Sequence, residues 1–190
     1  MFCHAVDYIT FGEYSRQLAI LHDRQSPDAF GGKSGDDILL GQSGKDILLG
    51  GAGDDTLLGG DGADGLSGFS GNDLLNGGPG SDIFEFDFSA GLIGTDRIAQ
   101  IEAGIDTIRL IGSPYTSLQA ILADPEAVFE TASETRLFFG PGENIRILGV
   151  TAAELETINF EFVEGERTPL DGTPSPETLD GGGENEIISG

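Results

Sequence analysis

The stretch that decides the fold is GGAGDDTLLGGDGADGLSG, residues 50–68, in which glycine fills eight of nineteen positions and acidic residues stand between the glycines. Glycine loses more backbone freedom on folding than any other residue, and neighbouring carboxylates repel one another. Such a segment has little tendency to fold by itself. Its composition therefore predicts that some other group holds the folded chain together.

This stretch is part of a nine-residue repeat that begins at Gly32 and continues in constant register through six units. The first and fourth positions of every unit are glycine. The sixth position is always aspartate, at Asp37, Asp46, Asp55, Asp64, Asp73 and Asp82. The eighth is always large and apolar, at Leu39, Leu48, Leu57, Leu66, Leu75 and Phe84. Ordinary Asp-Gly turns do not explain this constant phase, and Asp28 with Phe30 indicates one further, degenerate unit upstream.

These residues resemble the calcium-binding nonapeptide repeats of the hemolysin-type, or repeats-in-toxin (RTX), family, whose pattern is G-G-x-G-x-D-x-U-x. The resemblance covers residues 32–85 and implies an all-β fold, a right-handed parallel β-roll in which two units complete one turn. The second glycine is the variable position, replaced by Lys33, Gln42 and Phe69. We expect strained backbone but retained binding in those units.

The spacing within each unit predicts a turn of six residues followed by a strand of three. Units 18 residues apart then stack about 4.8 Å from one another, which aligns the aspartates in columns. One column contains Asp37, Asp55 and Asp73, and the other Asp28, Asp46, Asp64 and Asp82. Aligned carboxylates repel unless a divalent cation lies between them. The stacked pairs predict about four or five Ca²⁺ ions, because calcium accepts many oxygen ligands in flexible geometry.

Backbone carbonyls of the turns are the other expected calcium ligands. The glycines that we expect to supply them are Gly32, Gly35, Gly41, Gly44, Gly50, Gly53, Gly59, Gly62, Gly68 and Gly71. Zinc or copper would favour histidine and cysteine, which the array lacks. Because the expected core is a thin ladder of eighth-position side chains, metal binding and folding should be a single transition.

The outward positions of alternate units are more apolar than a solvated face normally is. They are Ile38, Leu40, Thr56, Leu58, Leu74 and Asn76. This pattern predicts a cover, either a helix over residues 15–21 or a partner chain, including a second copy of this one.

The second half of the chain reads as a β-rich cap with short helices. Strands are expected over residues 83–88, 96–101, 106–111, 127–130, 135–139, 144–148 and 158–163, with one helix over residues 116–123 and a second beginning at the capping box of Thr151 and Glu154. Residues 96–110 resemble the family's exit segment, in which Asp96 and Asp106 either close one further cation site or are solvated strand-end carboxylates.

The predicted organisation has five parts: an N-terminal flank, partly helical or disordered (1–27), the β-roll (28–85), the cap (86–163), a linker (164–177) and a degenerate restart of the repeat (178–190). The linker is assigned from its proline, glycine and charged residues.

Charge and motifs limit the function. Thirty-three acidic residues against nine basic ones give a net charge of −24, which disfavours nucleic acid and anionic membranes as partners. The single cysteine, Cys3, excludes an internal disulfide, and His4 and His22 both precede the array. No apolar stretch is long enough for a membrane helix, and the N-terminus lacks the pattern of a cleaved secretory signal.

The sequence thus favours a non-catalytic module that folds on binding calcium outside the cell. The family resemblance implies a secreted protein exported by a bacterial type I-like route. An alternative is a module that binds acidic polysaccharide through Arg97, Arg109, Arg136 and Arg146, if these line one face and are not ion-paired. A catalytic role would need a pocket of acids away from the columns, and no HExxH, GxSxG or EF-hand motif occurs.

Overall fold

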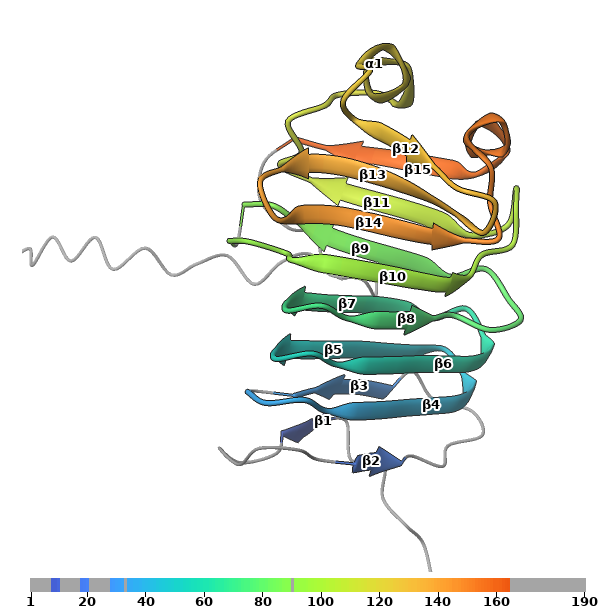
Figure 1. Cartoon of the computed structure of the whole chain (residues 1–190). Coiled ribbons are helices and arrows are strands. Elements are labelled where there is room, and N and C mark those ends of the chain that lie inside the picture. Colours follow the sequence, from blue (N-terminus) through green and yellow to red (C-terminus); the bar gives the residue numbers. More distant parts are fainter. Residues whose placement is uncertain (1–7, 11–17, 21–27, 33, 90, 165–190) are drawn as a thin grey trace, which may run out of the picture.

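The repeat folds into two facing parallel sheets that the chain enters alternately (Figure 1). The computed structural model describes residues 8–10, 18–20, 28–32, 34–89 and 91–164, with the backbone alone for residues 8–10, 18–20 and 28–31. The first sheet contains β1 (Tyr8–Thr10), β3 (Asp28–Gly31), β5 (Asp46–Ala52), β7 (Gly65–Ser70), β9 (Ile83–Asp87), β11 (Thr107–Ile111) and β15 (Asn159–Val163), in this order. The second contains β2 (Leu18–Ile20), β4 (Ile38–Gly44), β6 (Thr56–Gly62), β8 (Leu74–Asn76), β10 (Thr95–Gln100), β14 (Glu143–Leu148), β13 (Glu134–Gly140) and β12 (Val128–Glu130).

The strand register confirms the predicted roll. Ile38 of β4 pairs with Thr56 of β6, and Thr56 pairs with Leu74 of β8, so each step along the sheet is 18 residues. The degenerate upstream unit follows the same rule, because Asp28 pairs with Asp46. Successive nine-residue units therefore lie on opposite sheets, and two of them complete one coil.

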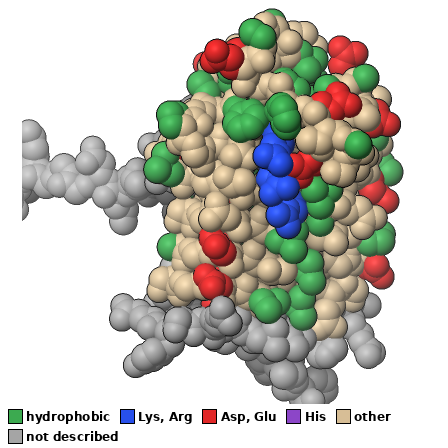
Figure 2. Space-filling model, in the orientation of Figure 1, with side chains coloured by type: hydrophobic (Ala, Val, Ile, Leu, Met, Phe, Trp, Pro, Cys, Tyr) green, Lys and Arg blue, Asp and Glu red, His purple; other side chains and the backbone are tan. Residues whose placement is uncertain are grey.

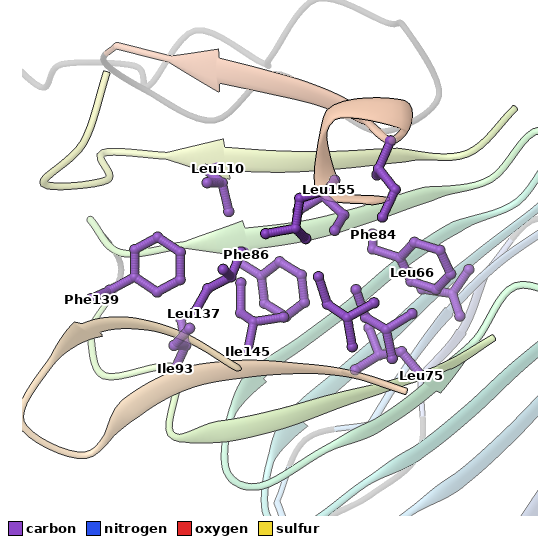
Figure 3. Close-up of a cluster of buried hydrophobic side chains, with 14 of the residues drawn as sticks. Leu66, Leu75, Phe84, Phe86, Ile93, Leu110, Leu137, Phe139, Ile145 and Leu155 are labelled. Carbon is purple, nitrogen blue, oxygen red and sulfur yellow. The ribbon is translucent and has the colours of Figure 1, made fainter. Parts of the chain in front are cut away.

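The eighth-position side chains form the core between the sheets, as expected. All six are at most 2% exposed. The core widens in the cap, where phenylalanine and isoleucine side chains from β9, β13 and β14 meet Leu155 (Figure 3). Each fully buried side chain of this size contributes about 1.5–3 kcal/mol. The array has one such residue in every nine, so its apolar core is thin compared with that of the cap.

The prediction that a helix over residues 15–21 covers the outer face is wrong for Leu18–Ile20. These residues form strand β2, which pairs with β4 and extends the second sheet instead of covering it as a helix. Ile38 is 44% exposed on that face. The rest of the expected helix, and Cys3, His4 and His22, lie outside the described residues.

The cap elements agree with those expected from the sequence. Helix α1 (Leu118–Ala123) begins at Ser117, whose side chain accepts a hydrogen bond from the Ala120 amide. The 3₁₀ helix η1 (Ala152–Thr157) follows Thr151, whose N–H and hydroxyl both donate to Glu154 Oε2.

Strand β13 pairs antiparallel with both β12 and β14, whereas β14 also pairs in parallel with β10. Both sheets therefore run from the array into the cap without interruption, and the boundary at residue 85 stays a prediction. No helix of the described part of the chain is long and apolar enough to cross a membrane. The predicted linker beyond Glu164 and the degenerate restart lie outside the described residues.

Candidate metal sites

Two columns of buried aspartates run along the edges of the roll, one for each sheet. The carboxylates of Asp55, Asp64, Asp73 and Asp82 are fixed by the coil before them, because the Oδ1 of each accepts the backbone N–H of the aspartate 18 residues earlier. The N···O distances are 2.7 Å for Asp37 to Asp55 and for Asp55 to Asp73, and 2.8 Å for Asp46 to Asp64 and for Asp64 to Asp82. The repeat thus aligns each carboxylate with the coils on both sides of it.

The second oxygen of several of these carboxylates has no hydrogen-bond partner. Oδ2 of Asp55, Asp64, Asp73 and Asp82 is fully buried and accepts no hydrogen bond within the described structure. A buried polar atom without a partner costs about 1–3 kcal/mol, and more when it is charged. Because the same atom lacks a partner in successive units, these oxygens fit the role of ligands to a bound group.

Each of these oxygens lies against a first-position glycine, at a point where a side chain would not fit. The position that a Cβ would take on Gly59 is 2.5 Å from Asp64 Oδ2 and 2.7 Å from the carbonyl oxygen of Gly77 in the next coil. Both distances are too short for a carbon atom, so only glycine lets these carboxylate and carbonyl oxygens lie close together, and calcium takes ligands of these two kinds. The residues present therefore suit a hard cation.

The same arrangement of two oxygens beside a glycine occurs between other coils of the array. Gly41 faces Asp46 Oδ2 at 2.6 Å together with the Gly59 carbonyl, and Gly50 faces Asp55 Oδ2 together with the Gly68 carbonyl. Beside Gly32 lie Asp37 Oδ2 and the Gly50 carbonyl. We call these four arrangements of a glycine and two oxygens, at Gly32, Gly41, Gly50 and Gly59, the glycine cradles. In each one, a carboxylate oxygen and a carbonyl oxygen from consecutive coils converge.

Burial raises the pKa of these carboxyl groups. Desolvation is the main cause at Asp55 and Asp82, whose pKa rises to about 7, and at Asp73, whose pKa rises to about 6. Neighbouring carboxylates raise the pKa further, whereas the amide hydrogen bonds lower it. The folded roll without metal therefore favours the protonated acids, and a divalent cation would reverse this preference.

The structure places eight of the ten predicted glycine carbonyls in two groups, and those of Gly32 and Gly41 are in neither. Those of Gly50, Gly59 and Gly68 close cradles, as does that of Gly77, which was not among the glycines predicted from the sequence. Those of Gly35, Gly44, Gly53, Gly62 and Gly71 lie against a glycine of the following coil, where a Cβ would collide. The side chain of Asp28 lies outside the described residues. No group of three or more acidic, histidine or cysteine side chains suited to a metal occurs among the described residues, so backbone oxygens are essential to these sites.

The expected single site shared by Asp96 and Asp106 is corrected. Asp96 lies on β10 and continues the first column, because its Oδ1 accepts the Asp73 amide at 2.9 Å. Asp106 precedes β11 and continues the second column, because its Oδ1 accepts the Asp82 amide at 3.0 Å. The two residues belong to different sheets and are both buried, not solvated.

The expected strain at the second position occurs at both described replacements of glycine. Gln42 has φ 77° and Phe69 has φ 66°, in the left-handed region that side chains other than glycine rarely adopt. Lys33 lies outside the described residues. The Gln42 carbonyl oxygen lies against Gly60 of the next coil, so the coil spacing is kept despite the strain.

Three of the four candidate arginines form a row across the outer face of the second sheet. Arg97 of β10 pairs with Arg146 of β14, and Arg146 pairs with Arg136 of β13. Figure 2 shows Lys and Arg side chains gathered in one strip on this face. Both Arg136 and Arg146 contact Glu134, at 2.5 and 2.7 Å, whereas Arg97 is exposed. Arg109 lies on the other sheet, 2.8 Å from Glu161 and 3.5 Å from Glu85.

Comparison with known proteins supports the metal-binding interpretation of the array. The chain matches the family model of the RTX calcium-binding nonapeptide repeat (4 copies) over residues 31–66 and 53–84. It is also similar to the solution structure of the AlgE6R3 subunit from the Azotobacter vinelandii mannuronan C5-epimerase, with 29% sequence identity, 65% of this chain and 77% of that chain covered, and a TM-score of 0.47. No curated protein matches the chain significantly.

Proposed function

Since residues 31–84 are an array of RTX calcium-binding nonapeptide repeats, we propose that the chain is a non-catalytic module that folds on binding calcium and belongs to a secreted, extracellular protein. The observation that supports this best is the glycine cradle. At Gly59, a buried carboxylate oxygen without a hydrogen-bond partner and a carbonyl oxygen from the next coil lie close together, and both are oxygen types that calcium binds. Each of the four described cradles is a candidate site for one ion, and about four or five ions are expected for the array.

The proposed mechanism is a transition from disorder to order driven by calcium. At the low free calcium of a cytosol, the acids repel and the thin core does not stabilise the coils, so the array stays unfolded and can be exported by a type I-like route. Outside the cell, sites with a Kd of about 10⁻⁴–10⁻³ M fill and the coils close. Calcium supplies the positive charge, and the chain supplies the aligned oxygens.

Circular dichroism tests this proposal. Calcium is titrated into protein from which it has been removed with a chelator, and magnesium is titrated in parallel. We expect a cooperative gain of strand signal with calcium and little gain with magnesium, because magnesium demands stricter octahedral geometry. Identical spectra in chelator and in calcium would contradict the proposal.

We propose as a second function that the arginine row binds an acidic polysaccharide. A polyuronate carries a carboxylate on every sugar, and the row presents its guanidinium groups on adjacent strands, about 4.8 Å apart. Thr95 and Asn144, which also pair across β10 and β14, supply polar neighbours. The ion pairs to Glu134 weigh against this function, since they neutralise part of the row. Arg97 has no ion pair among the described residues and is its most available member.

Binding of a soluble polyuronate to the calcium-loaded protein, with a neutral polysaccharide as comparison, tests the second function. Arg97→Gln should weaken binding, and Lys45→Gln is the matched control because Lys45 is exposed on the array, away from the row. Equal binding by the two variants and the unchanged protein would exclude the arginine row as the site.

Association of two copies through the outer face around Ile38 stays a prediction. It is tested by sedimentation of the calcium-loaded protein, where a monomer at all concentrations would contradict it.

A further inference from the structure

Two strands of the cap retain half of the repeat pattern. Gly94, Asp96 and Ile98 have the spacing of the fourth, sixth and eighth positions, and so do Gly104, Asp106 and Ile108. The separation from the preceding aspartate of each column is 23 and 24 residues instead of 18. Insertions of five and six residues therefore place these two half-repeats out of the nine-residue phase.

The backbone of these half-repeats is bonded as in the array. Within the array, the residue after each aspartate donates its N–H to the aspartate carbonyl of the previous coil, for example Thr56 to Asp37 at 2.8 Å. Arg97 donates to the Asp73 carbonyl and Thr107 to the Asp82 carbonyl, again at 2.8 Å. The half-repeats are thus the next turns of the roll.

Both glycines of the half-repeats keep the positive φ of the fourth position, and Gly94 also keeps its contact with the preceding coil. Gly94 and Gly104 have φ +86° and +72°, and Gly94 bridges to Gly71 as Gly80 bridges to Gly62. A Cβ on Gly94 would collide with the Gly71 carbonyl, the collision that fourth-position glycines avoid throughout the array. The turn before Asp96 therefore keeps the packing of an array turn, whereas a Cβ on Gly104 would meet only the Thr157 carbonyl oxygen, at 3.9 Å, so the turn before Asp106 keeps the positive φ but not the close contact with the preceding coil.

Unpartnered carboxylate oxygens occur at this junction as well. Asp73 and Asp82 are 1% and 0% exposed, and the Oδ2 atom of each accepts no hydrogen bond within the described structure. A Cβ on first-position Gly68 would collide with Asp73 Oδ2, and one on Gly77 with Asp82 Oδ2. These oxygens therefore lie against glycine as in the cradles, although the nearest atoms here are all of the aspartate and the next coil is contributed by the cap.

Both columns end immediately after this junction. Ile145 of β14 pairs with Asp96, and Ile158 precedes Asn159, the partner of Thr107. Both isoleucines are buried. An apolar side chain in the aspartate position cannot bind a cation, so Asp96 and Asp106 are the last carboxylates of their columns.

We propose that Asp73 with Asp96, and Asp82 with Asp106, form two further calcium sites that join the roll to the cap. This inference rests on the proposed function, since it extends the same chemistry to residues outside the repeat match. Together with the five stacked pairs 28/46, 37/55, 46/64, 55/73 and 64/82, the junction pairs give seven intervals between consecutive aspartates. The two at the junction fix the cap to the roll through a cation as well as through apolar contacts.

Counting bound ions tests the inference. Asp96→Asn, Asp106→Asn and the double variant are compared with the unchanged protein by native mass spectrometry and by elemental analysis after dialysis against calcium. Asparagine keeps an oxygen to accept the amide of the previous coil. Each single variant should bind one ion fewer and the double variant two fewer. Asp87→Asn is the matched control and should bind as many ions as the unchanged protein. Asp87 lies in β9, outside both columns, and its Oδ1 accepts a hydrogen bond from the Ser89 N–H.

A double variant that binds as many ions as the unchanged protein overturns the inference. If a variant does not fold by circular dichroism, crystals of the unchanged protein grown in calcium decide the question. Ions between Asp73 and Asp96 and between Asp82 and Asp106 support the inference, whereas filled array sites beside empty junction intervals refute it. If the unchanged protein binds no calcium at all, the proposed function itself is wrong.

Discussion

Adding a methyl group at one cradle is the sharpest test of how the array binds metal, and Gly59→Ala is the variant of choice. Gly59 does not have a positive φ, so its backbone accepts alanine without left-handed strain. The added methyl group would lie 2.5 Å from Asp64 Oδ2 and 2.7 Å from the Gly77 carbonyl. It would therefore collide with the two oxygens that we propose as ligands and push them apart.

The expected loss has two parts that depend differently on calcium. Overpacking costs about 1–3 kcal/mol at any calcium concentration. Loss of one ion costs about RT ln(1 + [Ca]/Kd), which is about 1.4–2.7 kcal/mol when calcium exceeds Kd by about 10- to 100-fold. Only the second part grows with calcium, by about 1.4 kcal/mol for each tenfold increase.

Urea unfolding at several saturating calcium concentrations separates these parts. The free energy of unfolding of Gly59→Ala should rise less steeply with the logarithm of calcium concentration than that of the unchanged protein, by the equivalent of one ion. Gly149→Ala is the control. Its Cβ would meet nothing within 4 Å and its φ is +73°, so it reports backbone strain without a metal site. A calcium dependence for Gly59→Ala equal to that of the unchanged protein would refute the assignment of the cradle.

Other variants and conditions probe the columns and the strained turns. Asp64→Ala should reduce the free energy of unfolding in calcium about twice as much as Asp28→Ala, because Asp64 is aligned with Asp46 and Asp82 and faces two intervals, and equal losses in urea unfolding would contradict the geometry. Calcium affinity measured by titration calorimetry should fall as the pH is lowered from 8 to 5, because protons compete for carboxyls such as Asp55 and Asp82, whose pKa is about 7. A constant calcium affinity from pH 5 to 8 would argue against these ligands. The free energy of unfolding of the metal-free protein should change in the opposite direction, because acids with a raised pKa stabilise the fold at low pH and lose that contribution as the pH rises through about 7. Gln42→Gly should stabilise the calcium-loaded protein by about 1 kcal/mol in thermal unfolding by removing left-handed strain, and an unchanged or lower midpoint would contradict this account of the turn.

The nine-residue phase predicted the roll because every structural role recurs at a fixed offset. Aspartate, glycine and the eighth-position leucine each keep their place, and one alignment of the chain with itself locates all of them. The same alignment misses the half-repeats of the cap because their insertions break the period. Only the hydrogen bonds from Asp73 to Asp96 and from Asp82 to Asp106 show that the columns continue.

Topology explains the other differences between sequence and structure. β14 inserts between β10 and β13, so Arg97 becomes a neighbour of Arg146, a residue far along the chain, and no local pattern predicts that pairing. The sequence does not predict strand β2, because Leu18–Ile20 has no glycine or aspartate at the repeat positions, and the helix expected over residues 15–21 is wrong there. Its pairing with β4 depends on the edge that the first coil of the array presents.

The two halves of the molecule are stabilised by different forces, and the junction is where these forces meet. In the array, one buried apolar side chain per unit is accompanied by one buried carboxylate, so apolar burial and charge repulsion rise together as coils are added. In the cap, side chains such as Phe86, Leu137 and Ile147 add to the core without adding buried acids of the columns. The cap therefore has a stable surface on which coils can stack, whereas each coil of the array needs a cation to balance its own carboxylate. Because the columns end in Asp96 and Asp106 and are followed by isoleucine, the requirement for metal stops where the apolar core becomes sufficient.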